Sequence, residues 1–516
     1  MTIAIRARAV MTMDARTQPP QGLAVVVIEG DRIVAVGPAA ILDQHPAAEI
    51  IDVGERTVVP GFIDAHNHLS MMALHPLWAD LAGAHDVAAI GEALGATPPP
   101  HEPDGFIRAI AWDDGKVPLT CNELDELEPD RPLVLAHFSY HQCVVNSRAL
   151  DELHITASTP DPPGGRIEHF ADGRPNGVLA ERAWSEAHAR SVEPYSDPER
   201  WADLIVERAK VLRTEGITAV HDPACSPAAE AVYAQLAAAG RLPISVLAMP
   251  HPAAMLGDPD PARLDGPPTG EGDEWLRVGP VKLFADGGNN LAVDGHIHDH
   301  PVSVGIRFES VVESIALASA RGFGVAVHTM GNAMMDSVLD AFEAAARSGS
   351  HGHPFRIEHV TLAGPRHAAR MAAMGIIGVV QPGFISLLGP AVVGFEIAEA
   401  TWMPFGSLRE SGLTMAGSSD DPCDADGWRV LRSSELGVTR NLPSGETFGP
   451  DQRVAREDWL RAYTSGSAAA GGQLAERGTI TPGKRADLAV LDGRLDGDIQ
   501  PRVIQTWVAG ELVHEI

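Results

Sequence analysis

The sequence predicts an α/β protein: a (β/α)8 TIM-like barrel with a small β-sandwich domain built from both termini and an inserted subdomain. Three observations lead to this prediction. Short apolar runs alternate with helical patterns through the middle of the chain, strand-like segments occupy both ends, and one interval between two apolar runs is too long for a loop. The length of 516 residues is sufficient for a barrel and accessory domains.

Both ends of the chain carry the pattern of short β-strands. Residues 23–37 contain two β-branched runs about Gly30 and Asp31, which is typical of a hairpin. The last segment, with "ADLAVLDG" and "VIQTWVAGELVHEI", shows the same strand pattern with glycines at its turns. We therefore expect residues 1–57 and 478–516 to form one small β-domain.

The middle of the chain carries eight apolar runs separated by stretches such as "SVVESIALASARG", which has a helical pattern. Apolar strands that alternate with helices are typical of parallel strands buried on both faces, and eight of them suggest a closed barrel. We expect this barrel to comprise residues 58–74 and 201–477. The apolar runs lie at 61–66, 216–222, 243–250, 281–286, 324–329, 355–360, 378–382 and 413–420.

The interval between the first and second runs is longer than a loop in a compact domain. Residues 75–200 are therefore predicted to form an inserted subdomain between barrel strands one and two. Within it, "PLVLAHFSYHQCVVNSRAL" predicts a strand, a loop and the start of a helix.

Composition excludes several classes of partner. The chain has 69 acidic and 39 basic residues, a net charge of -30, whereas nucleic acids and anionic lipids require basic patches. Arg6, Arg8 and Asp14 interrupt any apolar core near the N-terminus, so we expect no signal peptide, and no run reaches the ~18–20 apolar residues of a membrane span.

The four cysteines contain no CxxC pair, which argues against a disulfide framework and suits a reducing compartment. We expect a cytoplasmic protein with a small-molecule substrate and with no nucleic-acid or membrane partner. Association as a homodimer is left open.

Polar residues recur at the C-terminal ends of the predicted barrel strands, where barrel enzymes carry their chemistry. Strands closed in a ring would aim these side chains at one centre, and burying four imidazoles and a carboxylate there is costly without a cation. Imidazole and carboxylate ligands suit Zn²⁺ and similar divalent metals. The residues are His66 and His68 after strand one, Lys282 and Asp286 in and after strand four, His328 on strand five, His359 on strand six and Asp420 after strand eight.

Each of these residues also has a structural explanation. A histidine at a strand end often only donates a hydrogen bond, Asp420 in "SSDDP" could cap a helix, and Lys282 could extend its amine to solvent. Five strand ends with suitable ligands together favour the metal site.

The motifs "VVPGFIDAHNHLS", "VKLFADGG", "VAVHTMGN", "RIEHV" and "SSDDP" resemble the amidohydrolase superfamily, and more narrowly its amidohydrolase-3 (YtcJ-like) branch. The insert segment "GRPNGVLAE" and the tail "GTITPGKRADLAVLDG" are similar to it as well, so the likeness spans nearly the whole chain. The resemblance implies a metal-dependent hydrolase acting on carbon–nitrogen bonds other than peptide bonds.

The resemblance also implies a role for each site residue. His66 and His68 would hold the more buried metal, and His328 and His359 the second. Lys282 would be carboxylated and bridge the two ions, so two divalent metals per chain, Zn²⁺ in the first place, are favoured over one. Asp420 would contact the metal and shuttle protons, and His141 would reach toward the substrate.

The sequence departs from the family pattern after strand four, where His296, His298 and His300 have HxHxH spacing. We expect this loop to face solvent or substrate. At "SSDDP" the spacing to Pro422 favours Asp420 over Asp421 as the proton shuttle.

The predicted reaction is hydrolysis of an amide, or of an N-acyl or N-formyl amine, by a metal-activated hydroxide, with Asp420 passing its proton to the leaving nitrogen. One alternative is a deaminase of the same superfamily acting on an amidine carbon; Lys282 favours the binuclear hydrolytic site instead. A second alternative is a non-catalytic scaffold, which the presence of every expected ligand disfavours. The substrate itself is not predicted.

Overall fold

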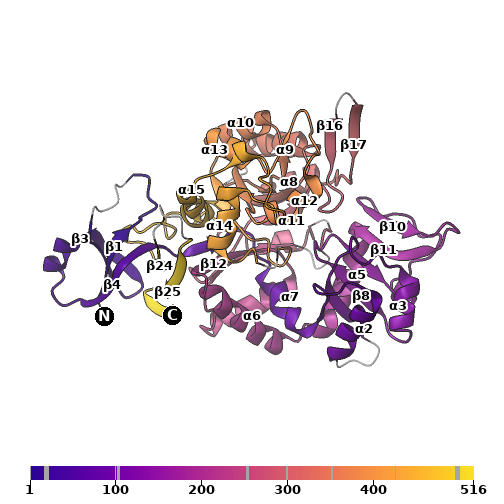
Figure 1. The fold of residues 1–516 in the computed structure, drawn as a ribbon, viewed down its shortest axis with the longest axis horizontal. Coiled ribbons are helices and arrows are strands. Elements are labelled where there is room, and N and C mark those ends of the chain that lie inside the picture. Colours follow the sequence, from indigo (N-terminus) through magenta and orange to yellow (C-terminus); the bar gives the residue numbers. More distant parts are fainter. Residues whose placement is uncertain are drawn as a thin grey trace.

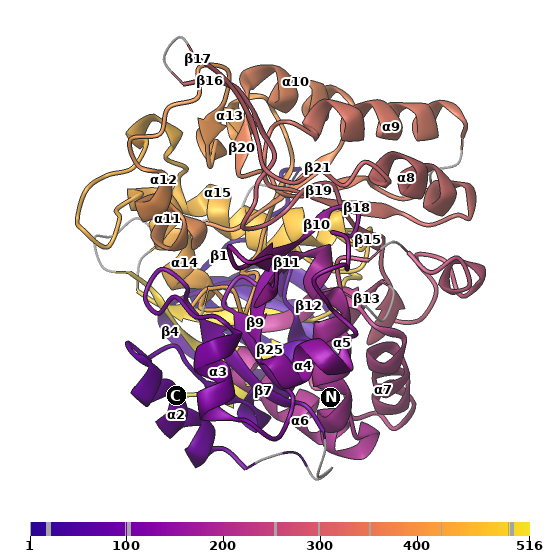
Figure 2. The same ribbon diagram turned by 90° about the vertical axis from the view of Figure 1, so that its right-hand side faces the viewer.

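A computed structural model describes residues 2–16, 22–98, 100, 105–251, 255–257, 259–297, 300–349, 352–424, 426–493, 495 and 500–516. Strands from the two ends of the chain form one sheet, a second sheet belongs to the insert, and two parallel sheets lie between them (Figure 1). Seen at right angles, the insert lies in front of the parallel strands (Figure 2).

The terminal sheet has seven strands in the order β26-β25-β24-β4-β1-β2-β3. The predicted hairpin is present, with Gly30 at a positive φ of 60° at its turn. The strands form one continuous hydrogen-bonded sheet, and the predicted sandwich packing stays a prediction. The strands are β1 (Thr2–Val10), β2 (Ala24–Glu29), β3 (Arg32–Pro38), β4 (Glu49–Pro60), β24 (Leu488–Asp492), β25 (Arg502–Val508) and β26 (Glu511–Glu515).

Each of the eight predicted apolar runs contains a strand. Four strands pair in the order β14-β13-β12-β5 and five in the order β15-β18-β19-β21-β23, all parallel. They are β5 (Phe62–Asp64), β12 (Ile217–Cys225), β13 (Ser245–Pro250), β14 (Leu276–Val278), β15 (Val281–Phe284), β18 (Val325–Thr329), β19 (Arg356–His359), β21 (Ile377–Val380) and β23 (Met415–Gly417).

A backbone hydrogen bond links the two parallel sheets at one edge, where Ala65 N, after β5, donates to Gly417 O at the end of β23 (3.1 Å). At the other edge the chain itself joins the sheets, because only two residues separate the end of β14 from the start of β15. Gly279 N, after β14, donates to Ala248 O of β13 (2.7 Å) and so extends the pairing within the first sheet. The carboxyl ends of the strands therefore point to the same side of the molecule.

Helices and short hairpins connect the parallel strands, and the helices predicted from "SVVESIALASARG" and "MMDSVLDAFEAAARSG" are α8 and α9. The connecting elements are α1 (Leu69–Leu74), α6 (Pro198–Arg213), α7 (Pro227–Ala238), the hairpin β16 (Val293–Ile297) and β17 (His300–Val304), α8 (Val311–Ala320), α9 (Met335–Arg347), β20 (Leu362–Ala363), α10 (Pro365–Ala373), α11 (Phe384–Leu387), α12 (Gly389–Val392), β22 (Thr401–Trp402), α13 (Phe405–Glu410), α14 (Val430–Thr439), α15 (Arg456–Arg461) and α16 (Ser467–Ala470).

A π-helical turn, Ala462–Gly466, joins α15 to α16 and packs against β23. A Cβ at Gly466 would lie 2.0 Å from Met415 O, and one at Gly417 would lie 2.5 Å from the Tyr463 ring. The absence of side chains at these two glycines allows the close packing.

The insert is built on a six-stranded sheet, and its segment 132–150 contains two strands where the sequence predicts one. The residues between His137 and Gln142 make a tight turn, so "QCVV" pairs back onto β8 as β9. The elements are β6 (Ala79–Asp80), α2 (Val87–Ala96), β7 (Ile107–Trp112), α3 (Cys121–Leu127), β8 (Leu133–His137), β9 (Gln142–Val145), α4 (Ser147–Glu152), β10 (Gly165–His169), β11 (Pro175–Glu181) and α5 (Ser185–Val192).

The four cysteines are free thiols. Among the helices of the described ranges, none has both the length and the apolar composition that crossing a membrane demands. The cytoplasmic location and the homodimer stay predictions.

Candidate metal centre

The six metal ligands predicted from the sequence line one small cavity, of about 50 Å³, at the carboxyl ends of the parallel strands, and we call it the metal cavity. All are at most 7% exposed. His66 and His68 follow β5, Lys282 lies in β15, His328 in β18, His359 ends β19, and Asp420 follows β23.

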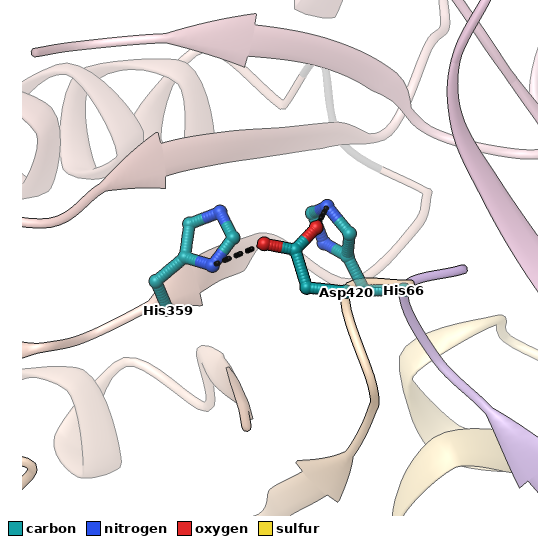
Figure 3. Close-up of side chains that lie close together, drawn as sticks. All are labelled: His66, His359 and Asp420. Atoms are coloured by element: carbon teal, nitrogen blue, oxygen red, sulfur yellow. Dashed lines mark ion pairs between the residues drawn. The ribbon is translucent and has the colours of Figure 1, made fainter. Parts of the chain in front are cut away.

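The Asp420 carboxylate is the centre of this group. Its Oδ1 lies 3.3 Å from Nε2 of both His66 and His68, and its Oδ2 lies 3.9 Å from His359 Nδ1. Figure 3 shows the carboxylate between the rings of His66 and His359. One ligand atom from each of these three residues lies within 4.8 Å of the others, which suits a shared cation.

His328 and Lys282 complete the cavity wall. The His328 ring centroid lies 4.6 Å from that of His359, and its Nε2, 3.9 Å from Asp286 Oδ1, is buried without a hydrogen-bond partner among the described residues. The Lys282 ammonium lies 4.3 Å from the centre of the Phe284 ring. Burial lowers the pKa of Lys282 to about 8.

This donor set fits a divalent cation. Burial lowers the pKa of His66 to about 4 and that of His359 to about 3, so both rings are neutral near pH 7 and have a lone pair for a metal. A buried imidazole nitrogen without a partner, as in His328, costs free energy that a metal bond would recover.

A buried Glu358–Arg356 pair, not predicted from the sequence, orients His66. His66 Nδ1 lies 2.6 Å from Glu358 Oε2, and Arg356 donates to both Glu358 oxygens at 2.8 and 3.0 Å. Nδ1–H donation to Glu358 leaves the Nε2 lone pair facing Asp420. The signal was in "RIEHV", where a carboxylate stands one residue before His359 on a buried strand.

Further hydrogen bonds position His359 and Asp420. His359 Nδ1 lies 3.0 Å from Gln381 Oε1. Ser419 donates through N and Oγ to the two oxygens of Asp64 at 2.9 and 2.6 Å, which ties the end of β5 to the segment after β23. His359 (φ 75°) and Asp420 (φ 56°) both adopt the left-handed backbone region, which is unfavourable for non-glycine residues and is often found at functional sites.

Asp421 has a different environment from Asp420. Its carboxylate forms an ion pair with Arg208, and it does not line the cavity. Asp286 is also structural, since it accepts hydrogen bonds from the backbone N–H groups of Met330, Gly331 and Ala292 at 2.9, 2.7 and 3.1 Å.

The insert contributes His141 to the cavity. His141 Nδ1 lies 2.6 Å from Oε2 of the fully buried Glu181, and its ring centroid is 5.0 Å from that of His328. The turn between β8 and β9 therefore covers the carboxyl ends of the parallel strands.

The described residues of the histidine-rich loop after β15 do not line the cavity. His296 and His300 lie on the β16–β17 hairpin, and His296 Nδ1 is 2.7 Å from Glu399 Oε1 at the surface. His298 lies outside the described residues.

The fold and this buried cluster define a metal-dependent hydrolase. The model of the amidohydrolase family matches residues 49–514, and the chain belongs to that family. The resemblance inferred from the sequence motifs is thereby confirmed.

Two relatives and one solved structure illustrate the similarity. The chain is 33% identical over 533 residues to N-substituted formamide deformylase of Arthrobacter pascens, covering 98% of this chain and 97% of the relative. It is 28% identical to the putative amidohydrolase YtcJ of Bacillus subtilis (strain 168), covering 87% and 86%. An uncharacterized metal-dependent hydrolase from Pyrococcus furiosus superposes with a TM-score of 0.73 at 25% identity, covering 96% and 100%.

Proposed function

We propose that this amidohydrolase hydrolyses the C–N bond of a non-peptide amide, an N-acyl or N-formyl amine. The observation that carries the proposal is the convergence of His66, His68 and His359 on the Asp420 carboxylate inside one buried cavity. A relative named N-substituted formamide deformylase, 33% identical over nearly the whole chain, supports this type of bond.

In this proposal the cavity holds Zn²⁺ or a similar divalent metal, with two ions favoured. The ligands would be His66, His68, His328, His359, Asp420 and a carboxylated Lys282. A cation held there supplies Lewis acidity and lowers the pKa of water toward ~7. Lys282 is 1% exposed, and within the described ranges no carboxylate lies at ion-pair distance from its amine. Carboxylation would replace this unpaired cation by an anion that can bridge two metals.

Asp420 and His141 carry out the remaining chemistry. Asp420 accepts a proton from the attacking water and delivers it to the leaving nitrogen, since an amine departs readily only after protonation. His141, oriented by Glu181, stabilises the carbonyl oxygen as negative charge develops on it.

We also propose that the two parallel sheets together form one closed (β/α)8 barrel. The hydrogen bond between Ala65 and Gly417 at one edge and the two-residue step from β14 to β15 at the other support closure. The corresponding domains are 58–74 plus 201–477 for the barrel, 1–57 plus 478–516 for the terminal β-domain and 75–200 for the insert.

A substrate screen tests the reaction. Protein loaded with Zn²⁺ is incubated with N-formyl and N-acyl derivatives of benzylamine, and free amine is measured. We expect amine release by the wild type and none by His66→Ala or His328→Ala. Ammonia release from amidine substrates, with no cleavage of any amide, would instead identify a deaminase.

A further inference from the structure

Two larger cavities adjoin the metal cavity. One, of about 870 Å³, shares Phe138, Gly288, Asn289, Leu387 and Leu388 with it, and we call this the outer cavity. The other, of about 460 Å³, shares His68, Met71 and Met255 with it, and we call this the second cavity. The two have no described lining residue in common, so they adjoin the metal cavity through different walls.

The second cavity is mostly apolar. It lies between α1, α5 and the start of α7, and its charged lining residues, Arg190 and Glu193, have opposite signs. Apolar walls of this kind favour a hydrocarbon chain, because burying each methylene group is favourable. The apolar lining includes Met71, Leu74, Val192, Trp201, Ala224 and Met255.

The outer cavity has an acidic lining. Asp113, Asp114 and Glu168 line it. Glu168 pairs with the lining Arg166 (2.8 Å) and Asp113 pairs with Lys116 (3.1 Å), so Asp114 is the carboxylate of the three that has no lysine or arginine partner among the described residues. Asp114 Oδ1 lies 3.2 Å from Nε2 of the buried His137, which fixes this carboxylate at the end of the cavity formed by the insert. The Asp114 carboxylate, which no lysine or arginine of the described residues neutralises, favours a cation beside it and disfavours an anion.

The charges of the products match these two environments. Hydrolysis adds the oxygen of water to the carbonyl carbon and breaks the C–N bond. The acyl fragment leaves as a carboxylate, and the amine takes a proton and leaves as an ammonium ion. The acidic outer cavity suits the ammonium product and repels the carboxylate.

We propose, building on the function proposed above, that the second cavity binds the acyl chain of the substrate and the outer cavity binds its amine. The substrate class is then an N-acyl amine with an extended apolar acyl group, such as octanoyl, rather than a formamide. Met71 and Met255 form the wall shared with the metal cavity, and their flexible thioether side chains can move aside for a chain.

The test uses benzylamides of one amine with formyl, acetyl, butanoyl and octanoyl groups. Ala189 in α5 and Ala228 in α7 line different sides of the second cavity, so Ala189→Trp and Ala228→Trp each fill it without changing the metal site. Ala189→Ser is the matched control, and melting curves verify that each variant is folded.

We expect kcat/KM of the wild type to rise with acyl length up to octanoyl. Either tryptophan variant should lower kcat/KM for the octanoyl substrate at least about tenfold, since a filled pocket rejects added methylene groups, and leave the formyl substrate within about twofold. Equal rates for all acyl lengths in the wild type, or an equal loss for formyl and octanoyl substrates in both variants, would overturn the assignment while leaving the hydrolytic function intact.

A binding measurement separates the two proposals. If no amide is cleaved, calorimetry with octanoate still tests the second cavity. Octanoate binding to the wild type that weakens about tenfold in Ala189→Trp would support the cavity assignment. In that case only the proposed reaction would be wrong. Octanoate binding that is absent, or unchanged in Ala189→Trp, overturns the cavity assignment.

Discussion

Asp420 and Asp421 are adjacent in the chain, yet their carboxylates have different partners. Asp420 lies among the imidazoles of His66, His68 and His359, whereas Asp421 pairs with Arg208 from α6. The positive φ of Asp420 separates the directions of the two side chains. This arrangement supports Asp420 as the proton carrier.

Replacing Asp420 by Asn should lower kcat at least about 10²-fold with little change in KM, because the amide keeps the shape but cannot accept the proton. Metal content should fall much less than in His66→Ala. Steady-state kinetics and elemental analysis measure both effects.

Asp421→Asn is the control for this variant. The Asp421→Asn variant should be less stable than the wild type, because the substitution removes the charge that pairs with Arg208, and it should retain its metal. Near-normal kcat in Asp420→Asn, with only a lower melting temperature, would show that Asp420 is structural.

Glu358→Gln should weaken metal binding about 10–100-fold, because the charged partner that orients His66 is lost. Since Arg356 would be left buried opposite a neutral amide, the free energy of unfolding should fall by about 3–5 kcal/mol. Metal titration and denaturant unfolding give the two values. Glu399→Gln, which removes a similar contact to His296 at the surface, should change neither.

Lys282→Ala should lower the metal content from about two ions per chain toward one, because a bridging carbamate holds two cations together. Short-chain carboxylic acids added to the variant should restore part of the second ion and of the activity. A wild-type protein that binds a single ion at saturation would contradict the binuclear centre.

Sequence reasoning picked out residues that line the metal cavity, while their role as ligands stays a prediction, and it missed most of the residues that orient them. His66, His68, His328, His359 and Asp420 share one position at strand ends, which is a periodic signal. The partners Glu358, Gln381, Asp64 and Glu181 act across strands or from the insert, and contacts between distant segments leave no periodic trace in a single sequence.

At the scale of elements, the π-helical turn Ala462–Gly466 holds β23, the strand that leads to Asp420. A methyl group at Gly466 would meet the backbone oxygen of Met415, which has no rotamer by which to move away. The position of Asp420 therefore depends on a glycine outside the metal cavity.

Gly466→Ala should destabilise the protein by about 1–3 kcal/mol, as expected for overpacking, and should also lower kcat because β23 must shift. Gly95→Ala is the matched control: nothing lies within 4 Å of its Cβ position in α2, so stability should stay the same or rise. Thermal unfolding measures the change in stability, and steady-state kinetics measure the change in kcat. Wild-type stability in Gly466→Ala would contradict the close packing.

The elements themselves were predictable to different degrees. Strands buried on both faces are continuous apolar runs, so the sequence predicts eight of the nine parallel strands. It does not predict β14, whose three residues, Leu276–Val278, are only half-buried and include Arg277. The sequence predicts a loop where β9 lies, because this strand is four residues long and follows a tight turn. Its pairing depends on its neighbour in space, β8, rather than on its own pattern.

At the scale of the whole molecule, a cation at the centre would join both parallel sheets, because His66 follows a strand of one and His328 and His359 belong to the other. Saturation at 100 times Kd should stabilise the fold by about 2.7 kcal/mol. We therefore expect a chelator to lower the melting temperature of the wild type, and re-addition of Zn²⁺ to restore it. His66→Ala should show a smaller response, and a wild-type melting temperature independent of chelator would argue against the site.

The terminal sheet can be completed only late in translation. β4 ends at Pro60, and its partner β24 begins only at Leu488. At a translation rate of about 5–20 residues per second, a ribosome needs on the order of tens of seconds to bridge this interval. During that time one edge of β4 lacks its native partner, and unpaired edges invite association with other chains. The order of the strands along the chain thus keeps this edge of β4 unpaired until translation is nearly complete.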